Sequence, residues 1–183
     1  MSNSRYMNRR NAIRTALIFS AGTALLPSCL QKDKATIPLK NISITGGQEN
    51  MLAQLADTIL PKTNFIGAAD VKAHEFLLMM VDDCLPPERQ KIFTNGLQQF
   101  DKWVDKKYGN SFANCTPQQK AACLTEVENK KEVPDEAVQF YQISKQHILQ
   151  AFTSSKQYML QVRHYNMVPG PNYKGCVAVS KVA

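Results

Sequence analysis

Few side chains in this sequence could do acid–base, nucleophilic or metal chemistry. The chain has three histidines, His74, His147 and His164. None of them stands in a His-x-x-x-His or Glu-x-x-His pattern, so the usual ligands of a metal site inside a helical bundle are missing. His147 lies among apolar residues at helical spacing, which predicts a hydrogen-bonded core residue. His74 is followed by Glu75 and is predicted to lie at the surface.

The short motifs that hold common cofactors are absent from the sequence. No two glycines are separated by a single residue, which excludes the Gly-x-Gly-x-x-Gly fingerprint of dinucleotide binding. There is no phosphate-binding Gly-x-x-x-x-Gly-Lys loop and no Cys-x-x-Cys-His for haem attachment. The acids Asp82 and Asp83 could hold a cation, but two acids at a helix end are usually solvated. We therefore predict no catalytic residue, no metal and no cofactor in this chain.

The N-terminal residues are typical of an export signal. Arg9 and Arg10 precede an apolar run of 11 residues, Ala16–Leu26, which is too short to span a bilayer as a helix. Paired arginines before a modest apolar stretch indicate a twin-arginine signal. Such a signal directs a protein to the export route by which folded proteins cross the membrane. Residues 1–28 are therefore predicted to be a signal peptide, and the mature protein is predicted to be periplasmic.

The signal ends in Leu26-Pro27-Ser28-Cys29, which resembles the lipobox of a bacterial lipoprotein. In such a protein Cys29 takes the lipid and becomes the first mature residue, so the protein is anchored to a membrane. Residues 29–47 are then predicted to be a polar tether between the lipid and the folded domain. The alternative is an ordinary signal peptide with a cysteine at its cleavage site.

The charge of the mature chain does not point to nucleic acid as a partner. Of the 22 lysines and arginines, four arginines lie within residues 1–28, which leaves 18 basic against 15 acidic residues. The lysines are scattered among acids rather than gathered along one face. Such a surface is solvated and lacks the basic footprint that nucleic-acid binding requires.

Four cysteines follow Cys29, at positions 84, 115, 123 and 176. An exported protein can form disulfides. Cys115 precedes a predicted helix and Cys123 lies two turns into it, so their Cα atoms would be roughly 10 Å apart, beyond the roughly 7 Å that a disulfide tolerates. The favoured pair is Cys84 with Cys176, since both lie at ends of predicted elements. The alternative is that most of these cysteines are small buried apolar residues.

The elements that must position these side chains are predicted to be helices. Apolar residues recur at helical spacing, with proline or glycine at the boundaries, in the ranges 48–60, 73–84, 87–108, 117–130, 134–152 and 156–165. Thr116 and Gln119 form a predicted capping box. The fold class is therefore all-α, a single bundle of five or six helices in a domain of residues 48–183. From Val168 the chain is predicted to be an irregular Pro/Gly-rich C-terminal arm.

Aromatic residues are concentrated before and within this arm. Six of the fourteen phenylalanines and tyrosines lie between residues 140 and 173. Tyrosines beside an irregular segment are typical of anchors in a protein interface. The candidate interface residues are Tyr158, Tyr165, Pro169, Gly170 and Tyr173. The alternative is that the aromatic side chains simply close the bundle.

Several of these segments together resemble one known family. They are Leu55–Thr63, Gly67–Val71, the helix Phe76–Cys84, Phe152–Ser154 and Pro169–Cys176. In this order they resemble the gluconate 2-dehydrogenase subunit 3 family, over roughly residues 48–177. The resemblance implies a small subunit that accompanies a large flavoprotein dehydrogenase through the twin-arginine route and stays bound to it. It also implies FAD in that partner, haem c in a third, cytochrome subunit, and no catalytic residue here.

The lipobox is a departure from many members of the family, and it would attach the complex to a membrane through lipid.

Two other functions compete with this expectation. A stand-alone helical lipoprotein that binds a small molecule or metal is the main alternative. An independent enzyme is disfavoured, because no nucleophile, base and orienting group are placed together by the sequence.

Overall fold

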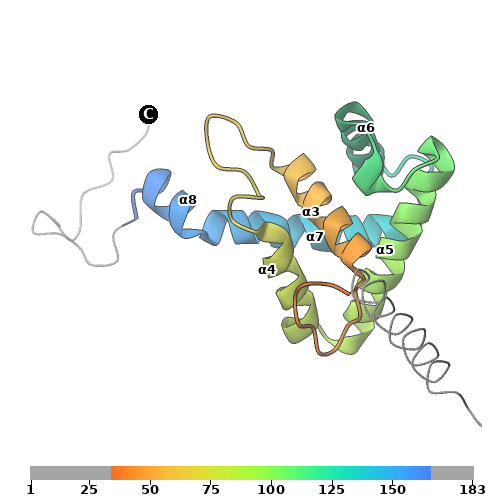
Figure 1. Cartoon of the computed structure of the whole chain (residues 1–183), viewed down its shortest axis with the longest axis horizontal. Helices are drawn as coiled ribbons and strands as arrows, with labels where there is room; N and C mark the ends of the chain where they lie inside the picture. Colours follow the sequence, from red (N-terminus) through yellow and green to blue (C-terminus); the bar gives the residue numbers. More distant parts are fainter. Residues whose placement is uncertain (1–33, 166–183) are drawn as a thin grey trace, which may run out of the picture.

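The computed structural model describes residues 34–165, in which the regular secondary structure is helical and is joined by loops (Figure 1). The α-helices are α3 (Gly46–Ile59), α4 (Ala73–Met79), α5 (Pro87–Tyr108), α6 (Pro117–Glu128), α7 (Asp135–Ser154) and α8 (Lys156–Gln161). A π-helix, η1 (Met80–Cys84), follows α4, and a 3₁₀ turn, η2 (Phe112–Asn114), precedes α6. No strand occurs within this part of the chain, only an isolated bridge between Lys34 and Thr45. The predicted all-α bundle is confirmed, and its Pro/Gly-rich arm lies outside the described residues.

Helix α7 runs through the middle of the bundle and packs on α5 and α4 (Figure 1). Its crossing with α5 is close because α5 carries Gly96 there. A Cβ atom at Gly96 would lie 2.3 Å from the carbonyl oxygen of Glu136 and 2.6 Å from the Cβ of Phe140. Only a residue without a side chain allows this approach. Because Gly96 lacks a Cβ atom, α5 and α7 can pack at this short distance.

Four phenylalanines fill the core around this crossing. Phe100 is central, with ring centroids 5.5 Å from Phe140 and 5.2 Å from Phe112. Phe93 lies 5.2 Å from Phe140. All four are fully buried, and rings at these separations add to the stabilisation that burial alone provides. Distant parts of the chain therefore meet in one core.

Local signals in the sequence place both ends of α5 and the start of α6 where they were predicted. Thr116 accepts a hydrogen bond from the Gln119 backbone while the Gln119 side chain accepts one from the Thr116 N–H, which confirms the predicted capping box. Thr45 forms a second capping box with Gln48. Gly109 ends α5 with φ 69°, a left-handed conformation that glycine adopts readily.

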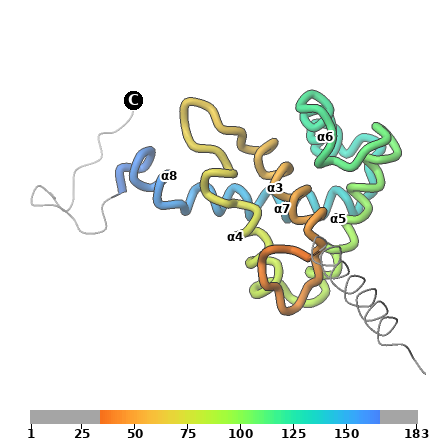
Figure 2. Tube along the Cα trace, viewed as in Figure 1, coloured from red at the N-terminus to blue at the C-terminus, as the bar shows by residue number. Residues whose placement is uncertain are grey.

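The predicted tether is wrong for residues 34–45, which fold onto the bundle. Figure 2 traces this segment as a loop beside the end of α4. Ile42 and Ile44 are buried in the core, and the backbone N–H and hydroxyl of Thr36 both donate to the carboxylate of Glu49. We call residues 34–45 the N-terminal strap. Alternating isoleucines in this segment dock on the helices instead of remaining in solvent.

Asp82, predicted to be solvated, is buried and holds this strap. Its carboxylate accepts backbone N–H groups of Lys40, Asn41 and Ile42 at 2.8, 2.7 and 2.8 Å. Asp82 lies within the π-helical turn Met80–Cys84, and such turns are frequent at functional sites. Burial alone would raise the pKa of Asp82, but the three N–H donors outweigh it and hold the pKa below its ordinary value.

The predictions for His147 and His74 have different outcomes. His147 is buried on α7, and its Nδ1 lies 3.2 Å from Oε1 of Gln150, which confirms a hydrogen-bonded core residue. His74 is half-buried rather than at the surface. Burial lowers its pKa below the usual value.

Candidate partner interface

The last described helix, α8, presents an apolar surface that the bundle does not cover. None of its residues is buried, and among the helices it packs chiefly on the end of α7. Leu160, Val162 and Tyr165 are 52, 44 and 51% exposed. In Figure 1 the helix lies at the end of α7 away from α5 and α6. Exposed apolar side chains that gather on and just after a short, projecting helix are typical of a surface that meets another protein.

The turn between α7 and α8 is encoded locally. Helix α7 continues through Thr153 and Ser154 and ends at Ser155, which has extended backbone angles. The Ser155 hydroxyl then accepts a hydrogen bond from the Tyr158 N–H at 3.2 Å and caps α8. The helix ends at Gln161, earlier than predicted, and the chain turns so that the Tyr165 N–H donates to the Met159 carbonyl at 2.9 Å.

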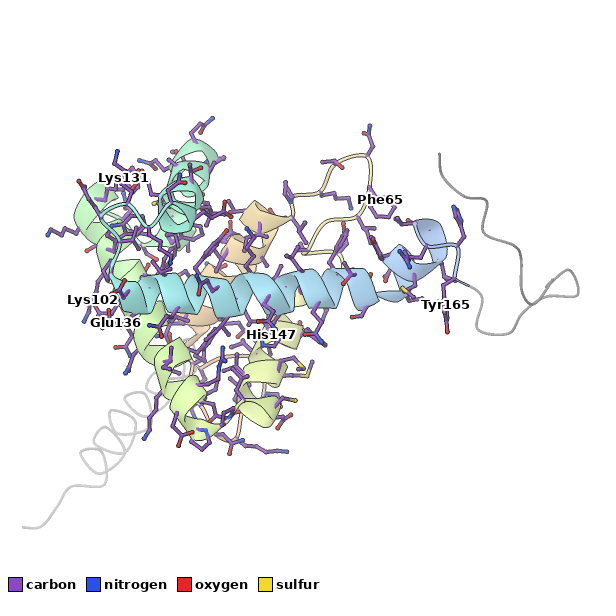
Figure 3. The ribbon with its side chains drawn as sticks, turned by 180° about the vertical axis from the view of Figure 1, so that it is seen from behind. Phe65, Lys102, Lys131, Glu136, His147 and Tyr165 are labelled. Atoms are coloured by element: carbon purple, nitrogen blue, oxygen red, sulfur yellow. The ribbon has the colours of Figure 1, made fainter. Side chains whose placement is uncertain are left out.

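Three aromatic rings fix α8 to the bundle. The Tyr158 ring lies 5.4 Å from Phe152 of α7, and Phe152 lies 6.4 Å from Phe65 in an edge-to-face arrangement. Phe65 comes from the loop between α3 and α4, and Figure 3 shows it reaching toward the α8 end of the molecule, where Tyr165 also lies. We call Phe65, Phe152, Tyr158, Leu160, Val162 and Tyr165 the α8 surface.

The loop that carries Phe65 is closed on itself by the residues of one sequence segment. Pro61 ends α3, and the N–H of Ala68 donates to the Leu60 carbonyl at 2.8 Å. Asp70 accepts the Gly67 N–H at 2.9 Å and pairs with the Lys62 ammonium at 2.8 Å. The bond from Lys62 lowers the pKa of the Asp70 carboxyl.

Gly67 is required in this loop. A Cβ atom there would lie 2.6 Å from the backbone nitrogen of Lys62, so a side chain would force the loop open. The segment 61–70 is thereby held as a compact ring that positions Phe65 against Phe152. Gly67, Ala68 and Asp70 therefore have a structural role in closing this loop.

The predicted interface residues are only partly within the described chain. Tyr158 is half-buried under Phe152, and Tyr165 is exposed, so the structure brings these two to one end of the molecule. Pro169, Gly170 and Tyr173 lie outside residues 34–165 and stay predictions. Sequence reasoning missed Phe65, Leu160 and Val162. A phenylalanine between Pro61 and Gly67 was the available signal for the first of these.

The other predicted functional residues fall largely outside the described chain. Arg9, Arg10, Cys29 and Cys176 lie within residues 1–33 or 166–183, so the signal, the lipid attachment and the Cys84–Cys176 disulfide stay predictions. Cys84 itself is exposed at the end of η1. Cys115 and Cys123 are buried and not joined to each other, as expected from their spacing.

The buried cysteines are poor nucleophiles. Burial raises the pKa of Cys123 to about 11, and it also raises the pKa of Cys115. Both therefore stay protonated at neutral pH, and the thiol form neither attacks substrates nor binds metals readily. Within residues 34–165, no group of three or more His, Cys, Asp or Glu side chains could hold a metal ion.

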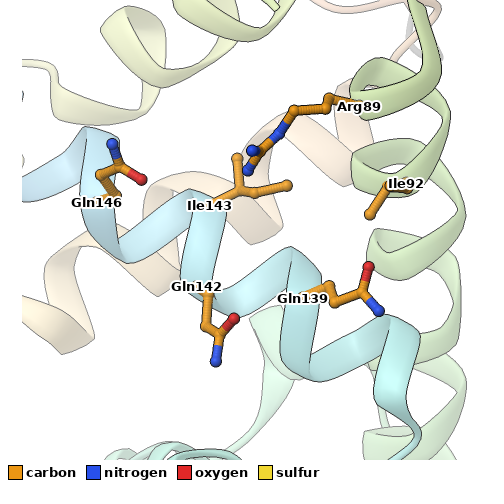
Figure 4. Close-up of a pocket in the computed structure, with 6 residues that line it drawn as sticks. All are labelled: Arg89, Ile92, Gln139, Gln142, Ile143 and Gln146. Atoms are coloured by element: carbon orange, nitrogen blue, oxygen red, sulfur yellow. The ribbon is translucent and has the colours of Figure 1, made fainter.

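A hollow of about 330 Å³ lies between α5 and α7, and Figure 4 shows its lining. Arg89 and Ile92 come from α5, and Gln139, Gln142, Ile143 and Gln146 come from α7. Arg89 is the single charged group in this lining, and neither a nucleophile nor an acid–base pair faces it. The hollow therefore lacks the groups from which an active site is built. No helix in the described part has both the length and the apolar character needed to cross a bilayer.

Comparison with known proteins gives one match. A model of the family described as Gluconate 2-dehydrogenase subunit 3 matches residues 47–170, which include nearly all of α3 and the whole of α4 to α8. The resemblance carried by the sequence segments is thereby confirmed. Searches of curated proteins and of solved structures gave no significant match.

Proposed function

Because the chain belongs to the gluconate 2-dehydrogenase subunit 3 family, we propose that it is a non-catalytic small subunit. It escorts, stabilises and membrane-tethers the large subunit of a flavin-dependent sugar or sugar-acid dehydrogenase. FAD resides in that large subunit, and haem c in a cytochrome subunit where one is present. No reaction is assigned to the small subunit itself.

The observation that carries this proposal is the α8 surface. It holds three exposed apolar side chains, Leu160 on α8 and Val162 and Tyr165 just after it, and no residue of the helix is buried. An isolated surface of this kind exposes apolar area to water, and a partner that covers it gains the corresponding hydrophobic stabilisation. The aromatic contacts of Phe65 and Phe152 hold α8 in place before the partner arrives, which reduces the entropy lost on binding.

The N-terminal sequence supports the escort role. Arg9 and Arg10 supply a twin-arginine address, and this route suits a flavoprotein whose folding and cofactor binding finish in the cytoplasm. Cys29 supplies the lipid that holds the exported complex on the membrane, facing the periplasm. Only four residues separate Cys29 from Lys34, where the strap begins, so the anchor holds the folded domain close to the lipid.

The test is co-expression of the chain with the flavoprotein dehydrogenase of the same organism. The wild-type chain is expected to co-purify with it, and Leu160→Asp is expected to release it. Met79→Asp serves as the matched control, since Met79 is 47% exposed on α4, away from the α8 surface. If the flavoprotein is exported and active without this chain, the proposal is wrong.

Export and anchoring are tested separately. Replacing Arg9 and Arg10 together by lysine should leave both proteins in the cytoplasm. Cys29→Ala should release the exported complex from the membrane fraction without changing its composition. Membrane retention of the Cys29→Ala variant would contradict the lipid anchor while leaving the escort role intact.

A further inference from the structure

Trp103, the single tryptophan of the chain, stands half-buried on α5 between two surface hollows. The hollows have volumes of about 340 and 430 Å³, and both are lined by Trp103, Lys106 and Glu132. They therefore adjoin at the indole, and we call the two together the Trp103 groove. The side chains that define this Trp103 groove are those of Lys102, Trp103, Lys106, Glu132, Val133 and Pro134.

The wall of the groove opposite α5 is preformed. Trp103 Nε1 donates a hydrogen bond to the backbone carbonyl of Glu132 at 3.0 Å. Lys130 and Glu132 in this connection have φ 52° and 54°, left-handed conformations that residues other than glycine adopt rarely. Such conformations persist where the surroundings hold them, and they cluster at binding sites. The indole of Trp103 therefore forms part of the groove surface, and its hydrogen bond to Glu132 also holds the opposite wall in place.

The groove carries positive charge that the described chain does not neutralise. Lys107 pairs with Glu126, and its ammonium lies 5.7 Å from the Trp103 ring centroid. Lys102 and Lys106, in contrast, form no ion pair with any of residues 34–165. They are exposed one helical turn apart, a spacing at which like charges repel each other. An occupant with carboxylates relieves that repulsion.

The shape and the lining of the groove together specify the occupant. Trp103, Val133 and Pro134 offer apolar contact, while Lys102 and Lys106 offer charge. Two open hollows that adjoin at the indole suit an extended polypeptide better than a compact small molecule. Glu126 and Glu132 also line the groove, and Glu126 is paired with Lys107.

The position of the groove relates it to the α8 surface. Figure 3 shows Lys102 and Lys131 at the end of α7 where Glu136 lies, and Tyr165 beyond the opposite end. Helix α7 has 20 residues and is therefore roughly 30 Å long. A standard interface of about 800 Å² on each partner has a comparable width. One partner can therefore contact both places.

We propose that the Trp103 groove binds an extended acidic segment of the dehydrogenase large subunit, with an apolar side chain on Trp103 and carboxylates on Lys102 and Lys106. This inference rests on the proposed function and adds a second docking point to it. The test uses the full chain and the large subunit, purified separately, with the dissociation constant measured at low and high salt. The variant is Lys102→Glu combined with Lys106→Glu.

The matched control is Arg89→Glu combined with Lys91→Glu, which changes the charge of α5 by the same amount outside the groove. The groove variant should bind about tenfold more weakly or worse, with the difference shrinking at high salt, and the control should bind as the wild type does. Equal binding by all three chains would overturn the inference and leave the proposed function standing. Failure of the wild-type chain to bind would defeat the proposed function itself.

A cross-linking arm identifies the occupant directly. Gln99 lines the groove and is exposed, so a photoreactive benzoylphenylalanine can replace it and leave the lysines unchanged. In the assembled complex the cross-link should fall on a large-subunit peptide that contains Asp or Glu. A cross-link to lipid, to another protein, or to a peptide without acidic residues would refute the assignment.

Discussion

Removal of the Asp82 carboxylate should detach the N-terminal strap. The side-chain carboxylate of Asp82 accepts three backbone N–H groups from residues 40–42 at 2.7–2.8 Å. The backbone carbonyl oxygen of Asp82 also accepts the side-chain amides of Asn41 and Gln90. In the Asp82→Ala variant these backbone donors lose their partner. Hydrogen bonds to a charged group contribute about 1.5–3 kcal/mol each, so the gross loss is several kcal/mol.

The net loss has a ceiling, because the strap can detach and rehydrate. What is then forfeited is the docking of the strap, chiefly the burial of Ile42 and Ile44, worth about 1.5–3 kcal/mol for each side chain. Ordering of the strap offsets part of this gain. We expect Asp82→Ala to lower the free energy of unfolding by about 3–4 kcal/mol.

Asp82→Asn separates charge from shape. Oδ1 accepts the N–H groups of Asn41 and Ile42, and Oδ2 accepts that of Lys40. An amide keeps one acceptor but turns the other into a donor facing the Lys40 N–H. Its cost should therefore lie between zero and that of alanine, about 1.5–2.5 kcal/mol.

The assay is urea unfolding followed by circular dichroism, with hydrogen exchange of residues 36–45 as the local readout. Asp83→Ala is the control, because the neighbouring side chain is exposed, and it should stay within about 0.5 kcal/mol of the wild type. Faster exchange in the strap should accompany the loss of stability in Asp82→Ala. If Asp82→Ala matches Asp83→Ala in both measurements, the hydrogen bonds of the Asp82 carboxylate do not stabilise the strap.

The pH dependence follows from the same contacts. The pKa of Asp82 is held below its ordinary value of 3.8, so the folded state binds this proton less readily than the unfolded state. Its stabilisation is complete above the unfolded pKa, from about pH 5 upward, and is lost as the pH falls through the lower folded value. Asp82→Asn should remove this part of the acid sensitivity.

Three further predictions concern the core and the helix ends. Gly96→Ala should cost about 1–3 kcal/mol in urea unfolding, because the new Cβ would lie 2.3 Å from the Glu136 carbonyl oxygen; an unchanged midpoint would contradict the close crossing. Thr116→Ala removes the acceptor of the Gln119 N–H and should cost about 1 kcal/mol, measured in the same way, whereas Thr116→Ser should restore most of it. Cys123, with its pKa raised by burial to about 11, should resist iodoacetamide at pH 8 until urea unfolds the protein, and rapid labelling of the folded protein would show that the thiol is accessible.

The sequence alone determined the helices, because their signals act over a few residues. Thr116 caps α6 through a residue three positions away, and Gly109 ends α5 through its own backbone angle. Apolar spacing likewise identified the buried face of α7, including His147 and Ile148. Such signals are complete within one or two helical turns, so they can be interpreted before the tertiary structure is known.

The tertiary structure decided the features that depend on distant partners. Asp82 is a buried clasp rather than a solvated acid because its donors lie 40–42 residues earlier in the chain. Phe65 contacts Phe152, and Trp103 binds the carbonyl of Glu132. No local pattern distinguishes these side chains from others of their type. Their roles arise only when packing of the helices brings separate segments together and excludes water between them.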